Sequence, residues 1–359
     1  MRYLQGNQQD DHAMHHHYPD FDDHALITSR YDAHSGLSAL IAIHNDTRGP
    51  AIGGCRIIDY QSFDSAMTDV LRLSRGMTYK TAIAGIPYGG GKAVIIADPA
   101  RDKTTGLLEA FGDFVESLGG RYITSFDSGT TLADIETIAT RTSFAAGTLA
   151  EAGNASGTTA QGIYHCMRAA ADIVHGSPDL SGMTVAVQGV GNVGARLADR
   201  LARDGVLLIV ADANEARARE VADSLGAKWV AADRIDRTTA HIFAPCALGA
   251  VLSTKTIPDL SAQIVVGGAN NQLATPDCDE LLRRHGILYC PDYLANAGGI
   301  IDLHYQRSAW NAEAVETHVA SLADTFVDVA ERACAQGRGT AAVADEIAQE
   351  RFARPRTSA

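Results

Sequence analysis

Two lysines lie in apolar surroundings in the first half of the chain. Lys92 directly follows three glycines at 89–91 and precedes a short apolar run, and Lys80 lies in the apolar stretch before it. An ammonium group is costly to bury, so a lysine in such a place is expected to have a charged partner or a chemical role. The glycines leave room for a ligand beside the backbone. The alternative is that both lysines extend their amines to water.

A carboxylate with two interpretations follows these lysines. Asp127 comes at the end of a predicted strand over 122–125. It is either the cap of a helix that begins near Ala133, or a carboxylate that takes part in proton transfer. The residues around it leave both interpretations open.

A glycine-rich turn lies between an apolar strand at 185–188 and an amphipathic helix at 195–203. In a dinucleotide-binding turn the first glycine permits the tight bend, and the second lets the backbone approach a pyrophosphate. The third lets the helix pack against the strand. The helix N-terminus then presents N–H groups to the phosphates. The residues expected to contact the nucleotide here are Gly189, Gly191, Asn192, Val193 and Gly194.

An acidic residue follows the next predicted strand, at 207–210. Asp212 lies at about the spacing expected of the acid that accepts from the ribose 2′-hydroxyl. Such an acid repels a 2′-phosphate, so the sequence favours NAD over NADP. Arg217 and Arg219 lie further into the next helix and are interpreted as solvated charges, although they are the residues that could favour NADP.

These residues need a scaffold, and the chain alternates apolar β-like runs with amphipathic helices, which is typical of an α/β protein. From residue 184 on, the order strand, glycine-rich turn, helix, strand, helix predicts a doubly wound parallel sheet. The small, polar stretch at 151–159 is a predicted hinge. The earlier predicted elements are strand 37–44, helix 62–77, strand 93–97, helix 105–118 and strand 122–125.

Length and composition exclude several classes of protein. The 359 residues are enough for two domains, and the net charge of −13 disfavours a nucleic-acid or anionic-membrane partner. No apolar run is long enough to span a bilayer and no secretory signal precedes the first strand, so the expected location is the cytoplasm. The six cysteines form no CxxC pair and are expected to be reduced thiols in or near the core. No metal site is expected.

Several segments of the chain together resemble one enzyme family. They occur in the order GPAIGGCR, RLSRGMTYK, GGGKAVI, GRYIT–D–GTT, QGVGNVG, APCALG, GGANNQL and GILYCPDYLANAGGII. They resemble the amino-acid dehydrogenases that act on leucine, valine, phenylalanine and tryptophan, most of all the leucine dehydrogenases. The similarity extends from about His24 to Phe352.

The resemblance implies an activity and an organisation. The expected reaction is the reversible, NAD-dependent oxidative deamination of an apolar L-amino acid to its 2-oxo acid, with release of ammonia. The expected architecture is an α/β domain at 1–147 for substrate binding and oligomerisation, and a doubly wound, NAD-binding Rossmann domain at 148–339, with a cleft between them. A C-terminal helix at 340–359 is free to pack back on the first domain. Relatives form dimers to octamers, so a homo-oligomer is expected.

The resemblance also implies roles for individual residues. Lys80 binds the substrate carboxylate, Lys92 is the catalytic lysine and Asp127 is its acidic partner. Asn271 also holds the carboxylate. The other residues implied in the substrate pocket are Gly53, Gly54, Ile52, Ser125, Ile300 and Leu303. The other residues implied near the cofactor are Thr159, Ala244, Cys246 and Asn296.

Two departures from the family pattern bear on the substrate and the hinge. Phe126 is unusual beside the acid, and the segment 155–157 lacks the prolines common in the family, which predicts a softer hinge. Side-chain specificity in the family is set at the positions of Ile52, Ser125, Ile300 and Leu303. Three of these four are bulky and aliphatic, which favours a branched-chain substrate and leaves an aromatic one, phenylalanine or tryptophan, as the alternative. A protein of another class, an inactive NAD-binding scaffold, would tolerate the loss of Lys80, Lys92 or Asp127.

Overall fold

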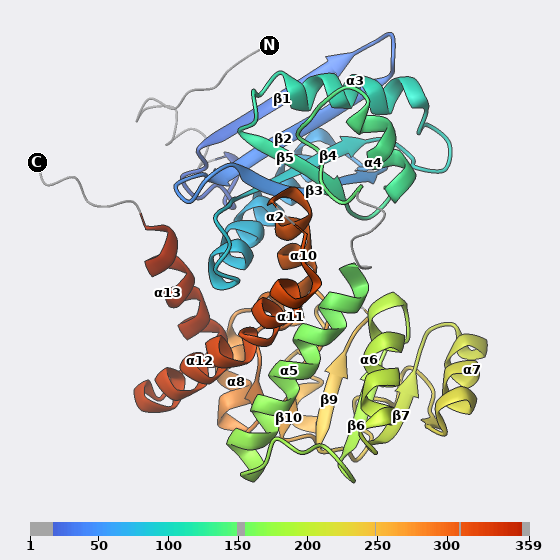
Figure 1. The fold of residues 1–359 in the computed structure, drawn as a ribbon, viewed down its shortest axis with the longest axis vertical. Helices are drawn as coiled ribbons and strands as arrows, with labels where there is room; N and C mark the ends of the chain where they lie inside the picture. The colour runs from blue at the N-terminus through green and yellow to red at the C-terminus, as the bar shows by residue number, and fades with distance from the viewer. Residues whose placement is uncertain (1–16, 149–154, 248, 309, 354–359) are drawn as a thin grey trace, which may run out of the picture. The chain divides into compact units, whose positions relative to one another are not determined.

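The computed structural model describes residues 17–148, 155–247, 249–308 and 310–353. The chain divides into two compact units, the first formed by Met1–Glu151 with Ala348–Ala359 and the second by Ala152–Ile347. Each unit contains one sheet with helices packed on it (Figure 1). The predicted α/β class, with a doubly wound parallel sheet in the second half of the chain, is confirmed.

The first unit has a five-stranded mixed sheet in the order β1-β2-β4-β3-β5. The pairs β1–β2 and β2–β4 are antiparallel, whereas β4–β3 and β3–β5 are parallel. The three parallel strands therefore run in one direction at the centre and one edge of the sheet. The strands are β1 (Leu26–Asp32), β2 (Leu37–Asn45), β3 (Ala51–Ile58), β4 (Gly89–Ile96) and β5 (Tyr122–Phe126).

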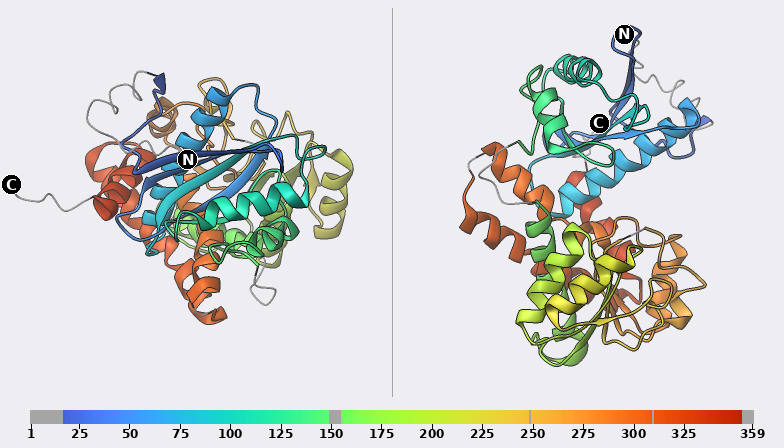
Figure 2. Two further views of the ribbon diagram at one scale, coloured as in Figure 1. Left: turned by 90° about the horizontal axis from the view of Figure 1, so that it is seen from above. Right: turned by 90° about the vertical axis from the view of Figure 1, so that its right-hand side faces the viewer.

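Helices cover both faces of this sheet (Figure 2). On one face Val70 and Leu71 of α2 pack in a buried cluster with Leu40 of β2. On the other face Phe111 of α3 and Ile135 of α4 belong to the larger core cluster. Burial of these apolar side chains from both helical layers holds the charged residues of the sheet in a rigid frame. The helices are α2 (Phe63–Ile83), α3 (Thr105–Glu116) and α4 (Leu132–Ala139).

The strand that carries Lys92 begins earlier than predicted. β4 starts at Gly89, so the triple glycine lies inside the strand and not in a loop before it. The physical reason is close approach: a methyl at Gly90 would overlap the backbone of Thr78 in α2, and one at Gly91 would lie 2.8 Å from the ring of Tyr122. Helix α2 likewise continues past the predicted end at residue 77, and Lys80 lies in its last turn.

The second unit has a six-stranded, fully parallel sheet in the order β11-β10-β9-β6-β7-β8. The strand order reverses beside β6, the strand that enters the glycine-rich turn, as in doubly wound sheets. The strands are β6 (Thr184–Gln188), β7 (Leu207–Ala211), β8 (Lys228–Trp229), β9 (Ile242–Pro245), β10 (Ile264–Val265) and β11 (Leu288–Tyr289).

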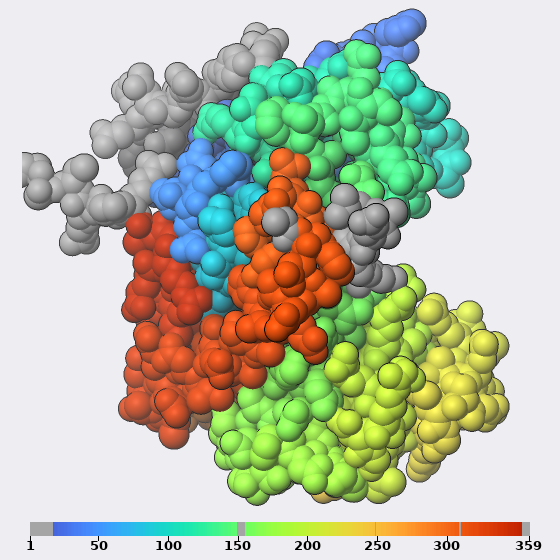
Figure 3. Space-filling view, in the orientation of Figure 1, coloured from blue at the N-terminus to red at the C-terminus, as the bar shows by residue number. Residues whose placement is uncertain are grey.

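Helix α5 packs against α6, α10, α11 and α12 in this unit. In Figure 3, α5, α6 and α7 form one side of its surface. The helices are α5 (Ala155–His175), α6 (Asn192–Arg203), α7 (Glu215–Leu225), the 3₁₀ helix η1 (Ile257–Asp259), α8 (Asp277–Arg284), α9 (Asp292–Ala295), α10 (Gly298–Ser308), α11 (Ala312–Ala320), α12 (Leu322–Gln336) and α13 (Thr340–Phe352).

The structure differs from two expectations about this part of the chain and bears on a third. The segment 155–157 is the first turn of α5 and not an extended hinge, and the rest of the predicted hinge, at 151–154, lies outside the described residues. Cys334 is exposed, contrary to the expectation of cysteines in or near the core. The last residues of α13 belong to the first unit, where Gln349 donates to the hydroxyl of Tyr79 at 2.9 Å.

Candidate active site

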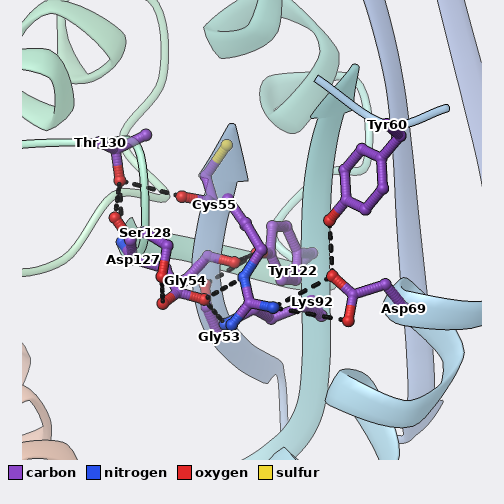
Figure 4. A network of polar contacts seen from close by, with 11 residues as sticks. Gly53, Gly54, Cys55, Tyr60, Asp69, Lys92, Tyr122, Asp127, Ser128 and Thr130 are labelled. Carbon is purple, nitrogen blue, oxygen red and sulfur yellow. Dashed lines mark hydrogen bonds and ion pairs between the residues drawn. The ribbon is translucent and has the colours of Figure 1, made fainter. Parts of the chain in front are cut away.

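A buried ion pair joins Lys92 to Asp127 in the first unit (Figure 4). Lys92 projects from β4, and its side chain is only 8% exposed. Asp127 directly follows β5, and its carboxylate Oδ2 contacts the Lys92 ammonium. The alternative that Lys92 extends to water is therefore wrong. The alternative that Asp127 caps the next helix is also wrong, because the side chain of Thr131 accepts from the N-terminus of α4.

Glycines in β3 make room for this pair. A methyl at Gly53 would overlap the carbonyl oxygen of Gly91, and one at Gly54 would lie 2.8 Å from the Cβ of Asp127. The phenol of Tyr122 donates to the carbonyl of Gly53 at 2.7 Å and so holds this stretch of β3 from within the sheet (Figure 4). Side chains at these two positions would push the strands apart and separate the lysine from the acid.

The turn after β5 fixes the carboxylate of Asp127. The Asp127 N–H donates to Thr130 Oγ1 at 2.8 Å, and the Ser128 hydroxyl donates to Asp127 Oδ1 at 3.4 Å. Burial by itself raises the pKa of Asp127, but the positive charges of Lys92 and Arg56 outweigh it and lower the pKa to about 2. Asp127 is therefore a carboxylate throughout the neutral and alkaline range. A buried amine beside a fixed carboxylate is an arrangement suited to proton transfer.

Arg56 is a charged neighbour that reasoning from the sequence missed. Its Nε donates to Asp127 Oδ2 at 3.3 Å, and its Nη1 donates to Asp69 Oδ2 at 3.1 Å. The only signal in the sequence is the basic residue at the end of the segment GPAIGGCR, shortly after the pocket glycines. Nothing in the spacing links that residue to Asp127, because the contact depends on β3 and β5 being neighbours in the sheet.

The two residues proposed to bind a carboxylate belong to different units. Lys80 is partly buried in the last turn of α2, and the close approach of Gly90 to Thr78 brings that part of the helix against β4. Asn271 lies in the second unit, exposed and with a left-handed backbone at φ 52°. Its carbonyl accepts from the N–H of Ala250 at 2.6 Å.

The glycine-rich turn of the second unit presents backbone rather than side chains. Gly189 has φ +91°, which only glycine adopts without strain, and a methyl at Gly194 would overlap the Gly189 carbonyl. A methyl at Gly191 would meet open space among the described residues. No side chain of the described residues caps the N-terminus of α6, whose first residues are Asn192 and Val193. These open N–H groups fit a pyrophosphate.

Asp212 is bound to that turn. Its Oδ2 accepts from the N–H of Val190 and its Oδ1 from the N–H of Asn214, both at 2.9 Å. The acid therefore holds the turn in shape, in addition to the ribose contact expected of it. The guanidinium of Arg219 pairs with Glu215 at 2.5 Å and stacks on the Trp229 ring at 3.9 Å, so it is already engaged.

The other predicted cofactor residues lie near the same sheet edge or at the start of α10. Ala244 pairs with Val187 near the ends of β9 and β6, and Cys246 donates its N–H to Gln188 at 2.7 Å. The hydroxyl of Thr159 in α5 would lie 2.9 Å from a methyl at Gly299 of α10. Just before α10, the buried amide of Asn296 donates to Asn270 Oδ1 at 2.8 Å.

The four residues predicted to set side-chain specificity divide equally between the units. Ile52 is fully buried in β3, and Ser125 is buried in β5 with no described residue in hydrogen-bonding distance of its hydroxyl. Ile300 and Leu303 lie one turn apart in α10 and are 6% and 8% exposed. Phe126, beside the acid, is 42% exposed.

The described residues offer neither a metal-binding cluster nor a membrane-spanning helix. No cluster of three or more histidine, cysteine or acidic residues in that part of the chain could hold a metal ion. Nor is any helix there long and apolar enough to cross a membrane.

Comparisons with known proteins match nearly the whole chain. Two family models match, "Glu/Leu/Phe/Val dehydrogenase, dimerisation domain" over residues 25–144 and "Glutamate/Leucine/Phenylalanine/Valine dehydrogenase" over 207–356. The chain is 42% identical to leucine dehydrogenase of Bacillus cereus, covering 92% of this chain and 91% of that protein. It is 42% identical to valine dehydrogenase of Streptomyces virginiae, covering 92% and 94%.

A solved structure is similar over the same extent. The crystal structure of L-tryptophan dehydrogenase from Nostoc punctiforme superposes with a TM-score of 0.82 at 39% identity, covering 95% of this chain and 98% of that one. The family resemblance read from the sequence segments is thereby confirmed. This chain belongs to the glutamate/leucine/phenylalanine/valine dehydrogenase family, and it is an amino-acid dehydrogenase, an oxidoreductase.

Proposed function

We propose that the chain catalyses the reversible, NAD-dependent oxidative deamination of an apolar L-amino acid, with branched-chain substrates favoured. The observation that carries this proposal is the buried pair of Lys92 with Asp127, an amine and a carboxylate in contact between β4 and the end of β5. Family membership supplies the reaction class. The pair supplies the groups that the hydrolytic half of the reaction needs, one to accept a proton and one to pass it on.

In this proposal Lys92 accepts a proton from the water that adds to the oxidised α-carbon of the substrate. Asp127 is a carboxylate at rest and orients the lysine, and it transiently accepts the lysine's proton and passes it on as ammonia leaves. The limited exposure of both side chains, 8% and 22%, keeps bulk water from competing for these protons. We propose that Lys80 and Asn271 bind the substrate carboxylate, and that Gly53 and Gly54 line the same pocket.

The second unit fits a dinucleotide, which accepts the α-hydrogen as hydride when bound. The open N–H groups at the start of α6 and the space at Gly191 would receive the pyrophosphate. Asp212 would accept from the ribose hydroxyl and repel a 2′-phosphate, and Arg219 is engaged elsewhere. These observations support NAD over NADP. Thr159, Ala244, Cys246 and Asn296 are proposed to lie near the nicotinamide end.

Ile52, Ser125, Ile300 and Leu303 are proposed to line the side-chain pocket. Three of the four are aliphatic, which favours leucine, valine or isoleucine. An aromatic substrate is the second candidate, favoured by the similarity to a tryptophan dehydrogenase and by the exposed ring of Phe126 next to the acid. A methylene is worth only about 1–3 kcal/mol in such a pocket, so both classes belong in the assay.

We also propose that the enzyme is a cytoplasmic homo-oligomer, of two to eight subunits. The match of residues 25–144 to a family model described as a dimerisation domain supports self-association. Light scattering on the enzyme as it elutes from a size-exclusion column would measure the number of subunits. A monomer at micromolar concentration would refute the proposal.

The test of the reaction is NADH formation with a panel of L-amino acids at alkaline pH, repeated with NADP. We expect turnover of branched-chain substrates with NAD, and a loss of about 10²- to 10⁴-fold in Lys92→Ala. Lys255→Ala, a change at an exposed lysine of the second unit, is the matched control and should leave turnover unchanged. Turnover of aromatic substrates alone would keep the chemistry and overturn the pocket assignment. Undiminished turnover in Lys92→Ala would refute the proposed catalytic role.

A further inference from the structure

Arg56 joins the catalytic pair to helix α2. Arg56 lies in β3 two residues after Gly54, and its side chain is 21% exposed. It divides its guanidinium between two carboxylates, with Nε on Asp127 at 3.3 Å and Nη1 on both oxygens of Asp69 at 3.1 and 3.4 Å. Asp127 Oδ2 therefore receives two cations, Lys92 and Arg56.

Asp69, the second carboxylate bound by Arg56, is itself held in place. Asp69 lies in α2, and its Oδ2 also accepts from the phenol of Tyr60 at 2.5 Å (Figure 4). Because Asp69 is anchored by both the helix and Tyr60, the guanidinium plane cannot swing freely away from Asp127. A planar donor with fixed ends is well suited to orienting a carboxylate.

We propose that Arg56, anchored by Asp69, is a positioning residue of the deamination reaction, which shares the Asp127 carboxylate with Lys92 so that the lysine can release its proton. The inference rests on the proposed roles of Lys92 and Asp127. The charges explain the effect. With Arg56 present, the negative charge of Asp127 stays compensated when the lysine becomes neutral. Without it, Asp127 would have the lysine ammonium as its main counter-charge and would oppose loss of the proton.

Other ionisable groups around the carboxylate do not complicate this balance. Burial raises the pKa of Cys55 in β3, of Tyr60 and of Tyr122 in β5, so all three stay uncharged at working pH. On the α4 side Asp134 is paired with Lys103 at 2.7 Å. Among the described residues, the charged groups paired with Asp127 are thus Lys92 from β4 and Arg56 from β3, with Asp69 of α2 behind the arginine.

The test compares two neutralising changes with opposite expected signs. In Arg56→Gln the rising limb of the plot of kcat/KM against pH should move to higher pH by about half to one pH unit. At pH values below that limb, kcat should also fall. In Asp69→Asn the amide can still accept from Arg56 and Tyr60, but the arginine charge is less compensated, so the same limb should move down. Loosened packing alone would not produce shifts of opposite sign. Arg56→Lys keeps the positive charge, so its rising limb should lie close to the pH of the wild-type limb.

Arg141→Gln is the matched control, because Arg141 forms an ion pair with Asp113 on the exposed surface of the same unit, and it should leave the profile unchanged. Circular dichroism and thermal melting of each variant establish that the chain is folded. An unmoved limb in Arg56→Gln, or shifts of equal sign in the Arg56→Gln and Asp69→Asn variants, would overturn the inference. The proposed function fails separately: it is refuted if Lys92→Ala keeps its turnover, whatever the arginine variants do.

Discussion

Glycines serve opposite purposes in the two units. In the first unit Gly53, Gly54 and Gly91 lie inside strands, where the missing side chains let β3, β4 and β5 approach and bring Lys92 to Asp127. In the second unit Gly191 lies between β6 and α6, where the missing side chain leaves backbone N–H groups open. One region buries the side chains that we propose to react, and the other exposes a backbone surface.

The difference teaches that a glycine-rich segment has no single meaning. What separates the two cases is the neighbour that a Cβ would meet. At Gly53 it is the backbone of the adjacent strand, so the glycine is needed for folding. At Gly191 it is open space among the described residues, which is consistent with the proposed binding of a nucleotide there. Substitutions at these two positions should therefore affect different measurements.

Gly53→Ala should give the largest effect. The methyl would overlap the Gly91 carbonyl, and backbone on both strands has little freedom to move. We expect a loss of about 3 kcal/mol or more in the free energy of unfolding, measured by urea denaturation, together with loss of activity. Gly36→Ala is unsuitable as a control because of its positive φ, whereas Gly106→Ala meets open space and is appropriate. A Gly53→Ala protein of normal stability would show that the strands can separate at no cost.

Gly191→Ala should leave the stability of the protein nearly unchanged and weaken its binding of the nucleotide. The backbone there has φ −68°, which alanine adopts. The free energy of unfolding should therefore change by less than about 1 kcal/mol. The methyl would occupy space proposed for the pyrophosphate, and the Kd for NADH should rise by about 10- to 100-fold, or roughly 1.4 to 2.7 kcal/mol. Fluorescence titration measures the Kd. Unchanged affinity would argue against nucleotide binding at this turn.

The first unit should also be the more sensitive to acid. Burial, with a further contribution from the nearby charge of His44, lowers the pKa of His24 from 6.5 to about 4. Because the unfolded chain binds a proton here at higher pH than the folded chain does, stability is complete above about pH 6.5. It is lost as pH falls toward 4. From about pH 7.5 to about pH 5 the loss should be about 2 kcal/mol from this group.

Urea unfolding of the wild type at the two pH values measures this loss, and His24→Asn should reduce it. Asparagine can still accept from the N–H of Asp22, which bonds to His24 Nδ1 at 3.1 Å. His285→Asn, at an exposed position of the second unit, is the matched control. An equal pH dependence in the wild type and His24→Asn would exclude His24 as the source.

Much of the scaffold could be predicted because it depends on local pattern. The strand at 185–188, the glycine-rich turn and the helix after it follow from apolar runs and turn residues that are neighbours in sequence. Helix α2 was predicted too short, because its last turn is held by packing on β4 rather than by propensity. The first residues of α5 resembled a polar hinge for a similar reason: small residues there pack against Gly298 and Gly299 of α10.

The sequence by itself determined the α/β class, the nucleotide-type turn and the identity of the residues that carry charge into apolar surroundings. Only the tertiary structure decided which charges meet. Asp127 pairs with Lys92 and Arg56 because β4, β3 and β5 are adjacent in the sheet, an order that no spacing along the chain encodes. The physical reason is range: propensity and periodicity act over a few residues, whereas an ion pair depends on distance in space between segments far apart in sequence.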